Sequence, residues 1–265
     1  MASLSARALS DLPEVRPGDD LAVLIVNALD EERERPVRPL HDGQIVVIAH
    51  KVISKAEGAL VDLATVTPGE AALELAAEQN KDPRGVQVVL DQSAEILRAS
   101  GGVLISRTHH GFVCANAGVD ASNTSRASET GAGETETLIV LPRDPDASAR
   151  ALRKRLRGLT GAHPAVLITD SFGRAWRHGQ CDVAIGCAGL GPLDDWRGRT
   201  DSFGLELRAT WIAVADAAAA TADLARAKDS REPVVLIDGL QRFVTAEDGP
   251  GAVALLRPLE EDLFR

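Results

Sequence analysis

Short, uninterrupted apolar runs constrain the fold of this chain more than any other feature of its sequence. Runs rich in valine, isoleucine and leucine predict buried strands at residues 44–49, 101–106, 138–141, 165–169, 183–190 and 234–237. Amphipathic or alanine-rich segments predict helices at residues 18–29, 68–79, 84–98, 145–159 and 211–227. Caps are expected at Asp19 or Asp20, at Thr67, and at Asp144 or Asp146. The strands and helices do not alternate regularly, so the sequence predicts an α+β (mixed α/β) fold.

The length of the chain suits a single unit over residues 1–265, or two subdomains packed closely together. Residues 122–137 are poor in apolar side chains and rich in serine, threonine, glycine and glutamate, which predicts a surface insertion. The predicted strand at residues 183–190 contains several small residues, so its backbone is expected to pack closely against a neighbouring element.

An excess of acidic residues argues against several classes of partner. The chain holds 39 Asp and Glu against 29 Lys and Arg, a formal net charge of -10, whereas binding to nucleic acid needs a basic face. Docking on an anionic membrane is not expected either, and no run approaches the roughly 20 apolar residues of a membrane span. Residues 1–13 lack the pattern of a signal peptide. Sparse cysteines, at Cys114, Cys181 and Cys187, predict reduced and buried thiols in a cytoplasmic protein.

A first polar cluster lies at residues 116–123. It offers the carboxylate of Asp120, the carboxamides of Asn116 and Asn123, and a serine hydroxyl. Mg²⁺ and Mn²⁺ take oxygen ligands of this kind, and Gly118 would let the backbone approach a ligand closely. The competing interpretation is an Asx-rich turn that bonds its own backbone. The pattern alone leaves these two possibilities open.

A second polar cluster follows the predicted strand at residues 165–169. Asp170 and Ser171 supply a carboxylate and a hydroxyl, as metal sites of nucleotide enzymes often do at the end of a strand. Arg174, Arg177 and His178 add a cationic run that suits phosphates or substrate carboxylates. The alternative is a helix cap at Asp170 followed by a solvated basic turn. The joint occurrence of both features favours a functional site.

A third polar cluster, at residues 50–58, follows the predicted strand at residues 44–49. Its lysines, Lys51 and Lys55, and its serine could contact the phosphates of a nucleotide, or could form an ordinary lysine pair on the surface. The chain has neither the glycine-rich phosphate loop nor the dinucleotide-binding fingerprint of common nucleotide enzymes. Any nucleotide site must therefore be built from dispersed residues.

In order along the chain, these clusters resemble those of the coenzyme F420-0:L-glutamate ligase family. The matching runs are Leu-Pro-Glu-Val-Arg-Pro-Gly-Asp-Asp-Leu (12–21), Val-Ile-Ser-Lys-Ala-Glu-Gly (52–58), His-Gly-Phe-Val-Cys-Ala-Asn-Ala-Gly-Val-Asp-Ala-Ser-Asn (110–123), Leu-Pro-Arg-Asp-Pro-Asp (141–146), Ile-Thr-Asp-Ser-Phe-Gly-Arg (168–174), Trp-Arg-His-Gly-Gln (176–180), Asp-Val-Ala-Ile-Gly (182–186) and Asp-Leu-Phe (262–264). Each run is weak evidence by itself, but the ordered set is specific and spans nearly the whole chain.

The resemblance implies a ligase that adds L-glutamate to coenzyme F420-0 through γ-linked amide bonds, using GTP, Mn²⁺ or Mg²⁺, and K⁺. It implies transfer of the GTP γ-phosphate to the coenzyme carboxylate, followed by attack of the glutamate amine on the acyl phosphate. It further implies an intertwined homodimer of two tightly associated domains, without the C-terminal nitroreductase-like domain that some relatives carry. A metal-dependent phosphohydrolase and a non-catalytic nucleotide-binding subunit are the alternatives.

Carried over position by position, the resemblance assigns metal ligands to Asp120, Asp170 and Ser171. It assigns nucleotide contacts to Leu12, Pro13, Glu14, Val15, His50, Lys55 and Asn123. The expected catalytic residues are Asp120, Asp170 and Lys55.

The chain departs from the family pattern near its predicted long helix. Arg226-Ala227-Lys228 stands where the family often has Met-Gly-Glu or Met-Gly-Gln, whose acid or amide reaches a metal. A protonated lysine has no lone pair for a cation, so that metal contact is expected to be lost or replaced. Asp216-Ala217 stands in place of Asp-Glu, and Gly204-Leu205 in place of Gly-Arg.

Overall fold

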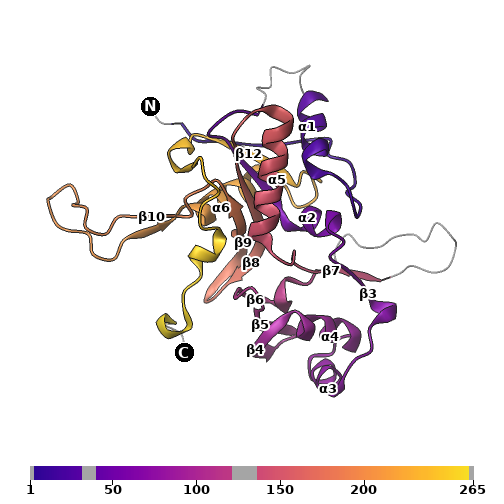
Figure 1. Cartoon of the computed structure of the whole chain (residues 1–265). Coiled ribbons are helices and arrows are strands. Elements are labelled where there is room, and N and C mark those ends of the chain that lie inside the picture. Colours follow the sequence, from indigo (N-terminus) through magenta and orange to yellow (C-terminus); the bar gives the residue numbers. More distant parts are fainter. Residues whose placement is uncertain (1–2, 32–39, 121–135, 263–265) are drawn as a thin grey trace.

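A five-stranded sheet forms the centre of the structure, a computed structural model that describes residues 3–31, 40–120 and 136–262 (Figure 1). Its strand order is β1-β12-β2-β8-β9, and only β2 and β8 pair in parallel. The strands are β1 (Ser5–Ala8), β2 (Ile45–Ala49), β8 (Ala165–Arg174), β9 (Arg177–Ala188) and β12 (Val234–Asp238). The mixture of helices with a largely antiparallel sheet confirms the predicted α+β class.

Helices cover both faces of this sheet. Val46, Ile48 and Ile168 point into a core shared with α1 (Leu21–Glu31) and α5 (Pro145–Thr160). The alternate residues of the same strands face a second core beneath α6 (Val214–Ala225), to which Ile45, Val47 and Leu167 contribute. Strands covered on both faces must be apolar throughout, which is why these runs are so evident in the sequence. Within the described ranges, no helix is both long enough and apolar enough to cross a membrane.

A smaller lobe lies beside the central sheet and has its own apolar clusters (Figure 1). Helix α2 (His50–Ala56) leads out of β2 toward it. The lobe contains β3 (Leu60–Asp62), α3 (Glu70–Gln79), α4 (Pro83–Asp91), β4 (Ser93–Ser100), β5 (Val103–Thr108), β6 (Val113–Ala115), the 3-10 turn η3 (Asn116–Gly118) and β7 (Thr137–Ile139). The chain then returns to the central sheet through α5.

An arm built on β10 (Leu193–Asp195) and β11 (Trp211–Ala213) projects away from the central sheet (Figure 1). The two strands pair in antiparallel fashion, and large apolar side chains on the arm face solvent. Phe203 is 88% exposed and Leu205 is 68% exposed. Exposed apolar side chains that gather in one place commonly mark a surface that binds another protein.

Two helix predictions were partly wrong. The helix expected at residues 84–98 ends at Asp91, and Ser93–Ser100 forms β4, which pairs with β5. The helix expected at residues 211–227 begins only at Val214, because Trp211–Ala213 pairs with β10. In both places, pairing with another strand overrides the local helical pattern.

The predicted caps give a mixed result. Asp20 Oδ1 accepts hydrogen bonds from the amides of Ala22 and Val23, and Asp144 Oδ1 accepts one from Ala147 N. Thr67 is not a cap, because α3 begins after Gly69 without a side-chain cap.

Gly186 confirms the predicted close packing of β9. A Cβ atom at this position would lie 2.4 Å from the carbonyl oxygen of Pro145, at the start of α5. Replacing Gly186 by alanine should therefore lower the free energy of unfolding by about 1–3 kcal/mol, because backbone atoms would have to move. Urea denaturation of the variant measures this loss.

Gly158 provides the matched control, because a Cβ there would meet no atom within 4 Å. It lies within α5, where alanine is the better helix former by up to about 1 kcal/mol. Gly158→Ala should therefore leave stability unchanged or raise it. Equal urea midpoints for the two variants would refute the steric explanation for Gly186.

Candidate active site

The parallel pairing of β2 with β8 brings His50 and Asp170 together. Ala49 is opposite Thr169 in the register. The residues that follow them, His50 and Asp170, therefore lie at the same edge of the sheet. His50 is 2% exposed, and its Nε2 lies 3.3 Å from Asp170 Oδ1, at an angle that does not suit a hydrogen bond. Its Nδ1 lies 3.4 Å from Ser54 Oγ. His50 therefore lies directly beside Asp170, and its expected nucleotide contact stays a prediction.

A cavity of about 180 Å³ brings the first two polar clusters together. One wall is formed by residues 114–116 and 118–120 of the smaller lobe, and includes Asp120. The facing wall is formed by residues 170–173 and Gln180 of the β8–β9 hairpin, and includes Asp170 and Ser171. The predicted metal ligands from two separate parts of the sequence therefore line one cavity.

Strand β8 does not stop at the polar cluster, contrary to the prediction. The strand continues to Arg174, because its residues remain paired with β9: Asp170 lies opposite Val183, and Ser171 lies opposite Asp182. The alternative of a helix cap at Asp170 is wrong as well, since its Oδ1 accepts from Ser171 N at 2.8 Å within the strand. The cationic run that includes Arg174 lies at the exposed tip of the hairpin, beyond the residues that line the cavity.

Helix α2 connects Asp120 with the N-terminal segment. Lys51 Nζ forms an ion pair with Asp120 Oδ2, and Lys55 Nζ donates to Glu14 Oε1 at 2.5 Å. The two lysines are four residues apart, which places them on the same face of the helix. Lys55 is only 15% exposed, so it is not an ordinary surface lysine.

The expected nucleotide segment thus lies against Lys55. Glu14 is exposed and touches the lysine, Pro13 is exposed, and Val15 and Leu12 pack into the core beneath α1. Contact of these residues with a nucleotide stays a prediction. Asn123, the remaining expected nucleotide contact, lies outside the described residues.

Packing and hydrogen bonds to the rest of the smaller lobe hold the turn at residues 116–118. Asn116, Ala117 and Gly118 all have positive φ, at 52°, 54° and 71°, a conformation that costs free energy in residues with a Cβ. A Cβ on Gly118 would lie 2.8 Å from the side chain of Leu141, so the glycine serves packing as well as the cavity wall. Asn116 Oδ1 accepts hydrogen bonds from Leu104 N and Lys81 Nζ, which tie the turn to its own lobe.

Asp182 is a site residue to which the sequence interpretation assigned no role. It is 2% exposed and accepts hydrogen bonds from Thr169 Oγ1 at 2.9 Å, Ser171 Oγ at 2.5 Å and Arg226 Nη2 at 2.5 Å. Burial by itself raises the pKa of Asp182, but the hydrogen bond from Ser171 and the charge of Arg226 outweigh it and hold the pKa below its usual range. Asp182 therefore stays ionised directly behind the cavity.

The two carboxylates on the cavity walls suit a divalent cation. Mg²⁺ is usually held by one or two protein carboxylates, with water and substrate phosphates as its other ligands. Asp120 and Asp170 provide this set, and no group of three or more His, Cys, Asp or Glu side chains converges as a metal site within the described parts of the chain. Ser171 is a weaker candidate ligand, because its hydroxyl donates to Asp182 and accepts from Lys228 Nζ at 2.7 Å.

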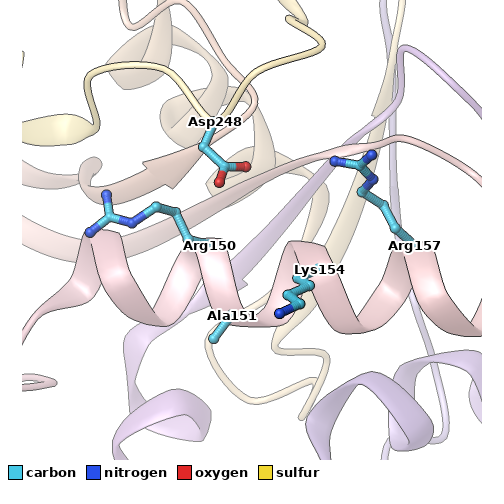
Figure 2. Close-up of a pocket in the computed structure, with 5 residues that line it drawn as sticks. All are labelled: Arg150, Ala151, Lys154, Arg157 and Asp248. Atoms are coloured by element: carbon cyan, nitrogen blue, oxygen red, sulfur yellow. The ribbon is translucent and has the colours of Figure 1, made fainter.

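A larger hollow of about 530 Å³ lies along α5, away from these residues (Figure 2). It is lined by Arg150, Ala151, Lys154 and Arg157 of the helix, and by Asp248. It shares no lining residue with the smaller cavity and contains none of the expected site residues. The smaller cavity is therefore the candidate active site.

The pKa and the reactivity of the cysteine thiols depend on how deeply each one is buried. Cys114 and Cys187 are buried, as predicted, and desolvation raises the pKa of each to about 12, whereas Cys181 is only half-buried. At pH 8 the two buried thiols are protonated and therefore unreactive. A disulfide reagent such as DTNB should label one thiol at most in the folded protein, at Cys181, and three in urea. Rapid labelling of Cys114 in the folded protein would contradict this expectation.

Comparison with known proteins agrees with the resemblance seen in the sequence. A family model described as F420-0:Gamma-glutamyl ligase matches residues 10–239. A protein of Methanothermobacter thermautotrophicus named Coenzyme F420:L-glutamate ligase is 42% identical over 263 residues, covering 99% of each chain. Proteins of the same name from Methanopyrus kandleri and Methanocaldococcus jannaschii are each 42% identical, over 95% and 86% of this chain and 94% and 86% of their own lengths. This chain therefore belongs to the F420-0:Gamma-glutamyl ligase family.

Proposed function

We propose that this chain is a GTP-dependent ligase that joins L-glutamate to coenzyme F420-0 through γ-linked amide bonds. One structural observation carries the proposal: Asp120 and Asp170, from separate lobes, line a single cavity in a chain of this family. Relatives of similar length that are named Coenzyme F420:L-glutamate ligase support the substrate pair. GTP and glutamate are cytoplasmic metabolites, and we place the reaction in that compartment.

The reaction proceeds in two steps. A carboxylate oxygen of the coenzyme precursor attacks the γ-phosphorus of GTP, and the bond to GDP breaks, which leaves an acyl phosphate. The amine nitrogen of glutamate then attacks the acyl carbon, phosphate leaves, and the amine loses a proton. The phosphoryl step converts a poor leaving group into a good one, which amide formation requires.

The side chains in the cavity and around it have separate tasks in this scheme. Asp120 and Asp170 would hold Mn²⁺ or Mg²⁺, and such an ion neutralises the charge of the phosphates when it is bound. Lys55 donates to a phosphate oxygen after exchanging its partner Glu14, and its charge stabilises the group in transfer. Arg174 and Arg177, on the exposed hairpin tip, attract the acidic substrates.

Mass spectrometry tests this function directly. Purified protein with GTP, Mn²⁺, glutamate and coenzyme F420-0 should yield a coenzyme heavier by whole glutamyl residues, with one GDP formed for each amide bond. Phosphate release from GTP without coenzyme or glutamate would indicate a phosphohydrolase instead. Tight nucleotide binding with no product would indicate a non-catalytic subunit.

The projecting arm supports a homodimer as part of this proposal. Phe203, Leu205, Trp211 and Ile212 expose large apolar surfaces on the arm, and a second copy of the chain would cover them. Sedimentation of the wild type should give twice the mass of the chain. Replacing Phe203 and Leu205 together by serine should shift the equilibrium toward the monomer.

Of the cations that the resemblance implies, the proposal retains both the divalent ion and K⁺.

A further inference from the structure

Three cationic side chains form a row along the larger hollow beside α5. Arg150, Lys154 and Arg157 are spaced four and three residues apart, so they lie on the same side of the helix. Figure 2 shows this cationic row with the carboxylate of Asp248 facing the helix from another segment of the chain. The hollow has a volume of about 530 Å³, within the range of roughly 300–1,000 Å³ that is usual for small-molecule sites. The cationic row therefore borders enough space for a small ligand.

The carboxylate of Asp248 does not neutralise the cationic row. Its Oδ1 accepts a hydrogen bond from Nη1 of Arg153 at 2.7 Å. That guanidinium is fully buried, so it has no access to another anion from solvent, whereas the side chain of Asp248 is 45% exposed. The ion pair of Asp248 with Arg153 is therefore neutral by itself, and the positive charge of the cationic row remains.

Ion pairs within the protein leave most of the cationic row uncompensated. Arg150 Nη2 lies 4.0 Å from Asp144 Oδ2, and both side chains are more than a third exposed, so solvent screens this contact. In residues 3–31, 40–120 and 136–262, no acidic side chain forms an ion pair with Lys154 or Arg157. Like charges at these spacings repel one another across a helix surface. Such clustering is unexpected in a chain with 39 acidic and 29 basic residues, and it indicates that an external anion balances the charge.

Phosphate groups suit the cationic row better than a carboxylate does. Arginine presents a planar fork that matches phosphate oxygens, and lysine adds a point charge. A phosphate monoester carries about two negative charges near neutral pH, so two linked phosphates compensate the whole row, whereas one carboxylate compensates a single cation. Arg150 and Arg157 are seven residues apart, about 10.5 Å along the helix axis, so a diphosphate can contact both through their long side chains. The net charge of -10 repels a long polyanion such as nucleic acid and favours a small ligand.

We propose that the cationic row on α5 is a second anion site, which binds a small ligand through a diphosphate group, away from the candidate active site. The two sites share no lining residue, so they bind their ligands through different side chains. The diphosphate comes either from free pyrophosphate or from a nucleoside diphosphate, since both present the same group to the row. A ligand that binds only the folded helix stabilises the fold, so occupancy raises the melting temperature.

Titration calorimetry and thermal melting with sodium pyrophosphate test this site, in EDTA and at constant ionic strength. EDTA removes divalent metal, on which phosphate binding at the candidate active site would depend. Wild-type protein should bind one pyrophosphate per chain, with a saturable rise in melting temperature, and should bind inorganic phosphate more weakly. The triple variant Arg150→Gln, Lys154→Gln and Arg157→Gln should lose at least tenfold in affinity for pyrophosphate. Lys55→Met, which alters the candidate active site, should bind pyrophosphate as the wild type does.

The matched control neutralises three exposed arginines outside the hollow, through Arg98→Gln, Arg208→Gln and Arg242→Gln. It changes the net charge by the same amount and should retain pyrophosphate binding. An equal loss in both triple variants would show that only the overall charge attracts the anion, and would overturn the proposal. Wild-type protein without saturable binding, or a folded variant of the cationic row that binds as tightly as the wild type, would overturn it as well.

GDP identifies the source of the diphosphate. The comparison uses the part of GDP binding that the triple substitution in the cationic row removes. If this part is tighter than the binding of pyrophosphate, the ligand is a nucleotide; if it is weaker, the ligand is free pyrophosphate, and both results support the site. These measurements need no turnover, so the second anion site and the proposed function are tested separately.

Discussion

Asp170→Asn is expected to reduce the rate of glutamate ligation by about 10²–10³-fold or more, the size of effect that follows removal of a preorganised charge from a reaction centre. The substitution keeps an oxygen that can accept from Ser171 N, and it keeps the volume of the side chain. What it removes is the negative charge on the cavity wall, which a divalent cation requires. Asp120→Asn removes the corresponding charge on the facing wall and should have an effect of similar size.

Two measurements distinguish this effect from general damage. Mn²⁺ binding, followed by electron paramagnetic resonance, should weaken in both variants, while their melting temperatures stay near that of the wild type. Asp91→Asn is the control, because it neutralises an exposed carboxylate of the smaller lobe outside the cavity. Near-normal ligation by both Asp120→Asn and Asp170→Asn would refute the assignment of this cavity as the active site.

Arg153→Met should produce the largest loss of stability, about 2–5 kcal/mol, because each buried carbonyl oxygen that loses its donor costs about 1–3 kcal/mol. The guanidinium is fully buried and donates to Pro164 O at 2.8 Å, Thr245 O at 2.7 Å and Asp248 Oδ1 at 2.7 Å. Methionine fills part of the volume but leaves these oxygens without donors. A domain is commonly stable by only about 5–15 kcal/mol, so the loss is a large share of the total.

Chemical denaturation measures this loss, with Lys154→Met as the control on the exposed side of the same helix (Figure 2). A surface substitution of this kind usually changes stability by no more than about 0.5 kcal/mol. Arg153→Lys keeps the charge but loses the forked geometry of the donors, so it should fall between the two. Equal midpoints for Arg153→Met and Lys154→Met would show that the buried hydrogen bonds contribute nothing net.

The strands of the central sheet are predictable from local sequence because of how they are covered. Residues of β2 and β12 are buried on both faces beneath α1, α5 and α6, so their apolar runs are continuous. The end of β8 is different, since four of residues 170–174 are polar or glycine and the segment resembles a loop when viewed locally. Hydrogen bonds from β9 keep them extended, and no short window of sequence contains that information.

The residues of the candidate site also divide into those that the local sequence reveals and those that it does not. Asp120 and Asp170 could be found because each belongs to a polar group that follows a predicted strand. Asp182 could not, because a single carboxylate just before the predicted strand at residues 183–190 has no partner nearby in the sequence. Its guanidinium partner, Arg226, is 44 residues away and is brought close only by the return of α6 along the sheet. The one available sign was the departure from the family pattern at residues 226–228.

Asp120 and Asp170 belong to two lobes with separate apolar cores, and this division has a mechanical consequence. Any hinge movement between the lobes changes the separation of the two carboxylates. A metal–phosphate group that binds both at once therefore acts as a crosslink, and part of its binding free energy resists the opening of the hinge. Binding of the metal–phosphate group and closure of the two lobes are therefore coupled equilibria. A change that makes the hinge open more easily also lowers the affinity for the phosphate.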